Sequence, residues 1–211
     1  MVSTSFDIAL TNYNRSHEAG DDFERIVDLT TALEAILTGG EADTEAVGLR
    51  LRSRAAALLW TEDDPGDSLF RDVGTLYGLR SKLVHGARIN ENDLRKRIHS
   101  LSTVSEDSPF GVAFAVAVDR LRDIVRRAIL ARLCLAAGDD PLWPFEGDTA
   151  VDAALSEESQ RSRWRQSWRE RLQSLGAGQA VDSTTPPEDP LRAPAASRSD
   201  ANVPSSPPPE I

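Results

Sequence analysis

Residues 20–40 read "GDDFERIVDLTTALEAILTGG" and carry the clearest helix signal of the chain. Apolar residues recur there at the three- and four-residue steps of a helix. The stripe consists of Phe23, Ile26, Val27, Thr30, Leu33, Ile36 and Leu37. The acidic start suits the positive end of the helix dipole, and the glycine pair at 39–40 is a helix stop. This stretch therefore predicts a long amphipathic helix with one side in a core.

The same periodicity recurs along the chain, and no stretch shows convincing strand alternation or an internal repeat. Further helices are expected over residues 4–19, 43–60, 90–101, 108–140 and 158–176. One more is expected to start near Asp67 and to carry the stretch from residue 76 to residue 89. The longest of these is expected to start with Ser108 as cap and Pro109 at its first position, and to lie across the others. The sequence thus predicts an all-α fold, a helical bundle over residues 1–175.

Residues 176–211 differ in composition from the rest. They hold 8 of the 12 prolines and almost no large apolar side chain. Such a segment cannot bury enough surface to offset its chain entropy. We therefore expect a disordered, acidic C-terminal tail.

The overall composition sets the class of protein. Hydrophobic residues make up 40% of the 211 positions and aromatic residues 6%, so the core is expected to consist mainly of aliphatic side chains. The single cysteine, Cys134, excludes an internal disulfide and fits a reducing compartment. The longest apolar run, residues 111–121, is too short to span a bilayer, and the first residues do not resemble a signal peptide. We expect a soluble, cytoplasmic protein with no membrane partner.

The charge is unevenly distributed. The net charge is -10, yet residues 76–137 hold 11 basic and 6 acidic side chains. Screening in physiological salt limits the reach of exposed charges to about 8 Å, so a bound polyanion responds to the local field. The acidic total therefore does not exclude nucleic acid as a partner of the middle third.

The middle third contains the stretch "LYGLRSKLVHGARI", residues 76–89. Helical geometry places Arg80 at the centre of an apolar face that also holds Leu69, Val73 and Leu76. A guanidinium does not lose its proton, and burying it without a partner is costly. Two partners fit equally at this point. One is a carboxylate from the acidic N-terminal helices, and the other is an anion such as a phosphate that binds and leaves.

His85 falls about 140° from Arg80 around an ideal helix, on the polar side with Ser81 and Lys82. One straight helix therefore does not bring the imidazole and the guanidinium together. Either the helix loosens near Gly86, or a second copy of the chain packs against it so that Arg and His of both copies share a cleft. The second route makes dimerisation an expectation.

The segment "LYGLRSKLVHG" resembles the signature of HEPN domains (higher eukaryotes and prokaryotes nucleotide-binding), and in particular the Apea-like branch. Arg80 and His85 stand at the Arg-x4-His spacing, with Tyr77, Ser81 and Gly86 around them. The upstream "FERIVDLTTALEAILTGG" is also similar to that branch. The resemblance covers roughly residues 6–90.

The resemblance implies a HEPN-type bundle and a metal-independent endoribonuclease whose site forms between the subunits of a homodimer. It also implies a role in prokaryotic defence or a toxin–antitoxin system, with RNA as substrate and no cofactor or metal. Arg80, His85 and Ser81 are then the expected catalytic residues, and the expected substrate contacts are Lys82, Arg88 and Tyr77. The expected products carry a 2′,3′-cyclic phosphate and a 5′-OH.

Other interpretations stay open at this stage. One is a non-catalytic HEPN module that binds RNA, a nucleotide or a partner such as a nucleotidyltransferase or cognate antitoxin. Another is a structural dimerisation module in which Arg80 pairs with an internal acid.

The remaining candidate side chains are interpreted structurally. His17 and His99 are expected on the surface, and Asp63, Asp64 and Asp67 in a solvated loop. The basic helix at 158–176 is expected to pack its Trp164, Trp168, Leu172 and Leu175 against the bundle. No metal-ligand spacing, phosphate-binding glycine loop or serine-triad signature is found.

Overall fold

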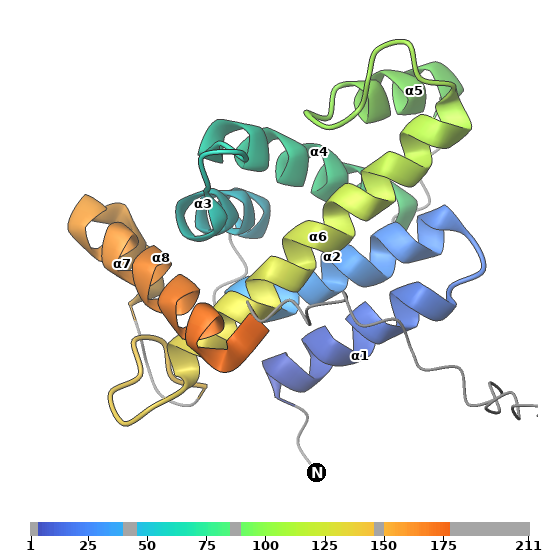
Figure 1. Cartoon of the computed structure of the whole chain (residues 1–211). Coiled ribbons are helices and arrows are strands. Elements are labelled where there is room, and N and C mark those ends of the chain that lie inside the picture. The colour runs from blue at the N-terminus through green and yellow to red at the C-terminus, as the bar shows by residue number, and fades with distance from the viewer. Residues whose placement is uncertain (1–3, 40–45, 85–89, 146–149, 178–211) are drawn as a thin grey trace, which may run out of the picture. The chain divides into compact units, whose positions relative to one another are not determined.

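The computed structural model describes residues 4–39, 46–84, 90–145 and 150–177, all within one unit (Figure 1). Every regular element in these ranges is a helix, so the all-α prediction is confirmed. The α-helices are α1 (Ser5–Glu18), α2 (Asp22–Thr38), α3 (Val47–Leu59), α4 (Gly66–Val84), α5 (Glu91–His99), α6 (Phe110–Ala136), α7 (Val151–Ser156) and α8 (Glu158–Leu172), followed by the π-helical turn η1 (Gln173–Ala177). The predicted tail lies outside the described residues from 178 onward.

The first two helices begin at side-chain caps. The Asp7 N–H donates to the Thr4 hydroxyl, and the Thr4 N–H donates to the Asp7 carboxylate, a reciprocal capping box. Asp21 accepts hydrogen bonds from the backbone N–H groups of Phe23 and Glu24, in the first turn of α2, at 2.8 and 2.9 Å. At the other end, α2 stops before Gly39, as the sequence predicts.

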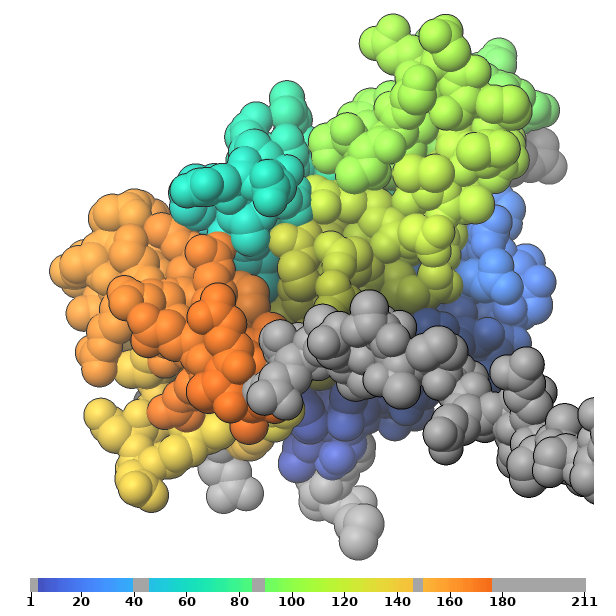
Figure 2. Space-filling view, in the orientation of Figure 1, coloured from blue at the N-terminus to red at the C-terminus, as the bar shows by residue number. Residues whose placement is uncertain are grey.

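Helix α6 spans the bundle and contacts α1, α2, α3, α5 and α8 (Figure 1). It begins at Phe110 with Pro109 as its cap residue, one position later than expected. Its buried side includes Ala113, Ala117, Ala128 and Ala131, whose small side chains let neighbouring helices approach closely. In the space-filling view, α6 (olive) lies between the α3–α4 segment (teal) and α8 (orange) (Figure 2).

The core residues of α2 are mostly those that the periodicity predicts. Ile26, Leu33 and Leu37 are at most 1% exposed. Thr30 is also buried, and its hydroxyl donates to the Ile26 carbonyl oxygen at 2.6 Å. Phe23 contradicts its prediction because it is 39% exposed, on the first turn of α2.

Helix α8 packs through its tryptophans, as predicted. Trp164 and Trp168 are 3% and 4% exposed, and the Trp168 indole N–H donates to the Leu58 carbonyl oxygen at 3.2 Å. Leu175 is 74% exposed because α8 has given way to η1 there, so its predicted packing is wrong. The short helix α7 was not expected from the sequence.

A buried ion network joins α4 to α6. Asp72 is 1% exposed and accepts hydrogen bonds from Arg120 and from the backbone and hydroxyl of Ser102. Arg120 also donates to both carboxylate oxygens of Asp64, at 2.7 and 2.8 Å, and Arg127 donates to Asp64 as well. The prediction of a solvated loop is therefore wrong at Asp64, because Arg120 and Arg127 hold its carboxylate.

Within the described ranges, no helix has the length and apolar content needed to cross a membrane.

Candidate functional site

Arg80 lies on the face of α4 that packs against α2. Its neighbours on that face, Leu69, Val73 and Leu76, are at most 1% exposed, as predicted. The Arg80 side chain keeps 24% of its surface exposed, so it lies at the edge of the core. The nearest carboxylate is that of Glu34 on α2, with Nη2 and Oε2 3.9 Å apart. An acid from an N-terminal helix thus faces this cation, one of the two partners that the sequence left open.

The pairing of Arg80 with Glu34 is loose. A separation of 3.9 Å is beyond hydrogen-bond distance, whereas Arg120 reaches its carboxylates at 2.7 to 2.9 Å. Arg80 Nε and Glu34 Oε2 are buried, and neither has a hydrogen-bond partner among the described residues. A buried donor left unpaired costs about 1–3 kcal/mol. A ligand that accepts a hydrogen bond from Arg80 would remove this cost.

Tyr77 completes this group, which we call the Arg80 cluster (Glu34, Tyr77 and Arg80). The Arg80 guanidinium lies 5.7 Å from the centre of the Tyr77 ring. Burial, and then the Glu34 carboxylate, raise the pKa of the Tyr77 hydroxyl, while Arg80 acts in the opposite direction. The tyrosine therefore stays protonated near neutral pH, and its ring lies beside the cation.

The other predicted site residues are placed only in part. Ser81 and Lys82 are half-buried in the last turns of α4, one and two positions beyond Arg80. Lys82 has no ion-pair partner in the described part of the chain. His85 and Arg88 lie outside the described residues, because α4 is described only to Val84. The expectation that the Arg80 guanidinium and the His85 imidazole share a cleft therefore stays a prediction.

Two arginines that the motif did not indicate lie over the glycines of α4. An ideal Cβ on Gly74 would be 3.3 Å from Arg52 Nη1 of α3, and one on Gly78 would be 3.7 Å from Arg97 Nη1 of α5. The available signal in the sequence is the pair of glycines four residues apart inside a helix, since glycine weakens a helix and often marks a close approach.

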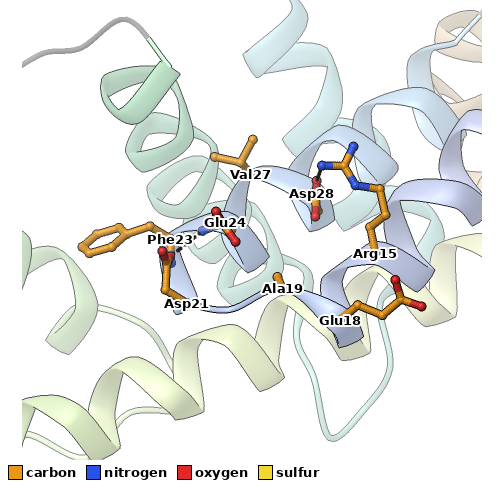
Figure 3. A pocket seen from close by; sticks show the side chains of 8 residues that line it. All are labelled: Arg15, Glu18, Ala19, Asp21, Phe23, Glu24, Val27 and Asp28. Atoms are coloured by element: carbon orange, nitrogen blue, oxygen red, sulfur yellow. Dashed lines mark hydrogen bonds and ion pairs between the residues drawn. The ribbon is translucent and has the colours of Figure 1, made fainter.

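A pocket of about 420 Å³ lies between the end of α1 and the start of α2 (Figure 3). Arg15 and Asp28 form an ion pair in it at 3.5 Å, and Glu18, Asp21 and Glu24 line the same pocket. Burial raises the pKa of Asp28, Arg15 acts against this rise, and Glu24 adds to it. The excess of acid makes this pocket unsuited to phosphate.

Two adjacent pockets of about 530 and 440 Å³ lie along α3 and share Ser53, Ala57 and Arg161. Their cations are already engaged, because Arg161 and Arg165 both pair with Glu158. These pockets offer less unpaired positive charge than the face of α4 that carries Gly74 and Gly78, where Arg52 and Arg97 lie.

The described residues contain no group of three or more His, Cys, Asp or Glu side chains that could hold a metal ion. Comparison with family models, with curated proteins and with solved structures found no match for this chain. The candidate site offers a half-buried guanidinium with a buried Nε that has no hydrogen-bond partner among the described residues, and the Tyr77 ring beside it. Ser81 and Lys82 follow in the same helix, and Lys82 has no ion-pair partner in the described part of the chain.

Proposed function

We propose that this chain is a metal-independent endoribonuclease of the HEPN type that acts as a homodimer in prokaryotic defence or a toxin–antitoxin system. One observation carries the proposal. Arg80 is a half-buried cation whose only carboxylate neighbour in the described ranges is 3.9 Å away, and its Nε is buried without a hydrogen-bond partner. A guanidinium in that state can bind two phosphate oxygens with its fork of donors.

The reaction needs no external nucleophile, because RNA supplies its own 2′-OH. The O2′–P bond forms while the P–O5′ bond breaks, and a 2′,3′-cyclic phosphate and a 5′-OH result. A base takes the proton of the 2′-OH, and an acid gives a proton to O5′. We assign both proton transfers to the His85 side chains of the dimer, because an imidazole titrates near neutral pH. Arg80 is assigned to stabilise the negative charge that develops on the phosphorane oxygens, and Ser81 to orient the phosphate.

Glu34 has a defined part in this scheme. It compensates the Arg80 charge when no RNA is bound, and its 3.9 Å separation leaves the guanidinium able to turn towards a phosphate. A tight bidentate pair such as Arg120 with Asp64 would not release its cation as readily. Lys82 and Arg88 are proposed to offset the repulsion between Glu34 and the incoming phosphate.

The test is cleavage of single-stranded RNA in the presence of a chelator, with the ends of the products identified. Wild-type protein is expected to produce 2′,3′-cyclic phosphate ends, and the His85→Ala variant none. His17→Ala is the matched control, because His17 is an exposed histidine on α1, and it is expected to cleave like wild type.

Equal cleavage by wild type and His85→Ala, or cleavage by neither, contradicts the nuclease. In the second case, weaker RNA binding by Arg80→Ala would favour the non-catalytic HEPN module instead. Loss of folding in Arg80→Ala, with no effect of RNA on the wild type, would favour a structural role.

A further inference from the structure

The side of α4 that carries Gly74 and Gly78, both half-buried, differs from the side that carries Arg80. On an ideal helix Gly74, Gly78 and Ser81 lie about 100° to 160° from Arg80, so they share one face. The two glycines leave the backbone of this face uncovered by side chains of α4 itself.

Side chains from two other helices lie over these glycines. Helix α4 lies between α3 and α5 (Figure 1), and each of them contributes one arginine. Arg52 Nη1 of α3 is 3.3 Å from the Cβ position of Gly74, and Arg97 Nη1 of α5 is 3.7 Å from that of Gly78. Positions four residues apart on a helix are about 5–6 Å from each other, so the two guanidinium groups form a row along α4.

Among the described residues, both guanidinium groups lack an acid partner. In the described part of the chain, neither Arg52 nor Arg97 has an ion pair or a side-chain hydrogen bond, and Arg52 Nε is buried without a hydrogen-bond partner. The Arg52 guanidinium is held by stacking on the Phe70 ring, 4.4 Å from its centre. Most other arginines of the described residues are paired with carboxylates or backbone carbonyls, so this row is a local surplus of positive charge.

The acids near the row are already compensated or exposed. Asp67 at the start of α4 pairs with Arg71 at 3.0 Å, and Glu91 at the start of α5 pairs with Arg95 at 3.4 Å. Asp93 is exposed on α5 and makes no ion pair with Arg97 within the described residues. The row thus keeps its net positive charge, which Lys82 extends on the last turn.

We propose that Arg52 and Arg97, held over Gly74 and Gly78, form a track for the phosphate backbone of a single-stranded RNA that leads to the Arg80 site. This inference rests on the proposed function, since it assigns the path of the same substrate. The two glycines let the guanidinium groups lie close to the backbone of α4, and one row of cations fits one strand. A flexible single strand also reaches the in-line geometry of 2′-OH attack more readily than a regular duplex.

The experiment measures binding apart from cleavage. A fluorescent single-stranded oligonucleotide with 2′-O-methyl groups cannot be cleaved by this chemistry, and its affinity is measured by anisotropy over a range of salt. Each phosphate contact on a single strand contributes about 0.7 to the slope of log affinity against log salt. Arg52→Gln and Arg97→Gln are each expected to reduce the slope by that amount and to weaken binding about fourfold at 0.15 M salt.

Three controls separate charge from structure. Arg15→Gln removes the same charge from an arginine of α1 that is 65% exposed, and it is expected to bind like wild type. Arg52→Lys keeps the charge and is expected to restore the salt slope. Thermal unfolding of each variant checks that it is folded.

The outcomes distinguish the two proposals. Unchanged affinity and slope in Arg52→Gln and Arg97→Gln, with weaker binding by Arg80→Gln, overturns the track and leaves the nuclease standing. Weaker binding by the track variants, with no cleavage of unmodified RNA by the wild type, supports the track and overturns the nuclease. Tighter binding of a duplex than of the single strand overturns the assignment to single-stranded RNA, and no binding by the wild type overturns both proposals.

Discussion

Individual arginines in this protein differ mainly in how firmly each is held. Arg120 bridges Asp64 and Asp72 in a nearly dry environment, with its side chain 6% exposed. Arg132 is 7% exposed, donates to the carbonyl oxygens of Trp143 and Pro144, and burial lowers its pKa to about 10. Among the described residues, Arg80 has neither a carboxylate nor a carbonyl oxygen within hydrogen-bond distance. That difference separates a structural cation from one that is available to a ligand.

The Asp64 carboxylate is expected to make stability depend on pH. Burial alone would raise the pKa of Asp64, but the guanidinium groups of Arg120 and Arg127 outweigh it and lower the pKa. Its contribution to stability is therefore fully present above the unfolded pKa of 3.8 and is lost as the pH falls through the lower folded value. Asp64→Asn is expected to cost about 2 kcal/mol at pH 7, less than for a fully dry pair because the carboxylate is 16% exposed.

Urea unfolding at pH 7 and at pH 2.5 checks this expectation, since the difference between wild type and Asp64→Asn should shrink at the lower pH. Asp67→Asn is the control, because that side chain is 71% exposed and its loss should cost under about 0.5 kcal/mol. A constant difference at both pH values would contradict the assigned pKa shift.

The two sides of helix α4 differ in what they contact. Its inner side supplies core residues and Asp72, and its outer side carries glycines under two foreign arginines. Glycine has a packing reason at some positions in this region and none at others. A Cβ on Gly48 of α3 would lie 3.1 Å from the Tyr77 ring, whereas one on Gly78 makes ordinary contacts.

This contrast predicts opposite effects of the same substitution. Gly48→Ala is expected to lower the free energy of unfolding by about 1 kcal/mol, because the Tyr77 ring has to move. Gly78→Ala is expected to raise it by about 0.5–1 kcal/mol, since alanine favours a helix interior and the new methyl group has room. Thermal or urea unfolding of both variants is the measurement, and destabilisation of equal size in both would contradict this account of the α4 surface.

For the assembled protein, the motif predicts that a guanidinium and an imidazole from different copies of the chain meet. A mixture of Arg80→Ala and His85→Ala chains, refolded together, then contains heterodimers with one intact site of two. Random pairing across a two-fold axis gives about a quarter of the wild-type cleavage rate. Each variant alone is expected to be inactive. No recovery in the mixture, or a monomer in sedimentation experiments, would contradict the shared site.

The position of one member of the candidate site, Arg80, could be predicted from the sequence, but its surroundings could not. The position of Arg80 on an apolar face of α4 follows from helical periodicity, and the structure confirms it. Arg52 lies in α3 and Arg97 in α5, and nothing in their local sequence indicates that both lie over α4. The same holds for Asp64, which lies 56 residues before Arg120 and looks like one acid of a charged loop.

The amino-acid sequence by itself determined the helices, several of their caps and most of their buried faces. These features depend on contacts three or four residues apart, which any stretch of chain carries within itself. Only the tertiary structure decided which charges are neutralised and which stay available. The partner of a charged side chain comes from another helix, so its identity depends on how the helices pack. Phe23, expected in the core and found 39% exposed, shows the same limit, because periodicity gives the side of a helix and packing decides how far the core extends along it.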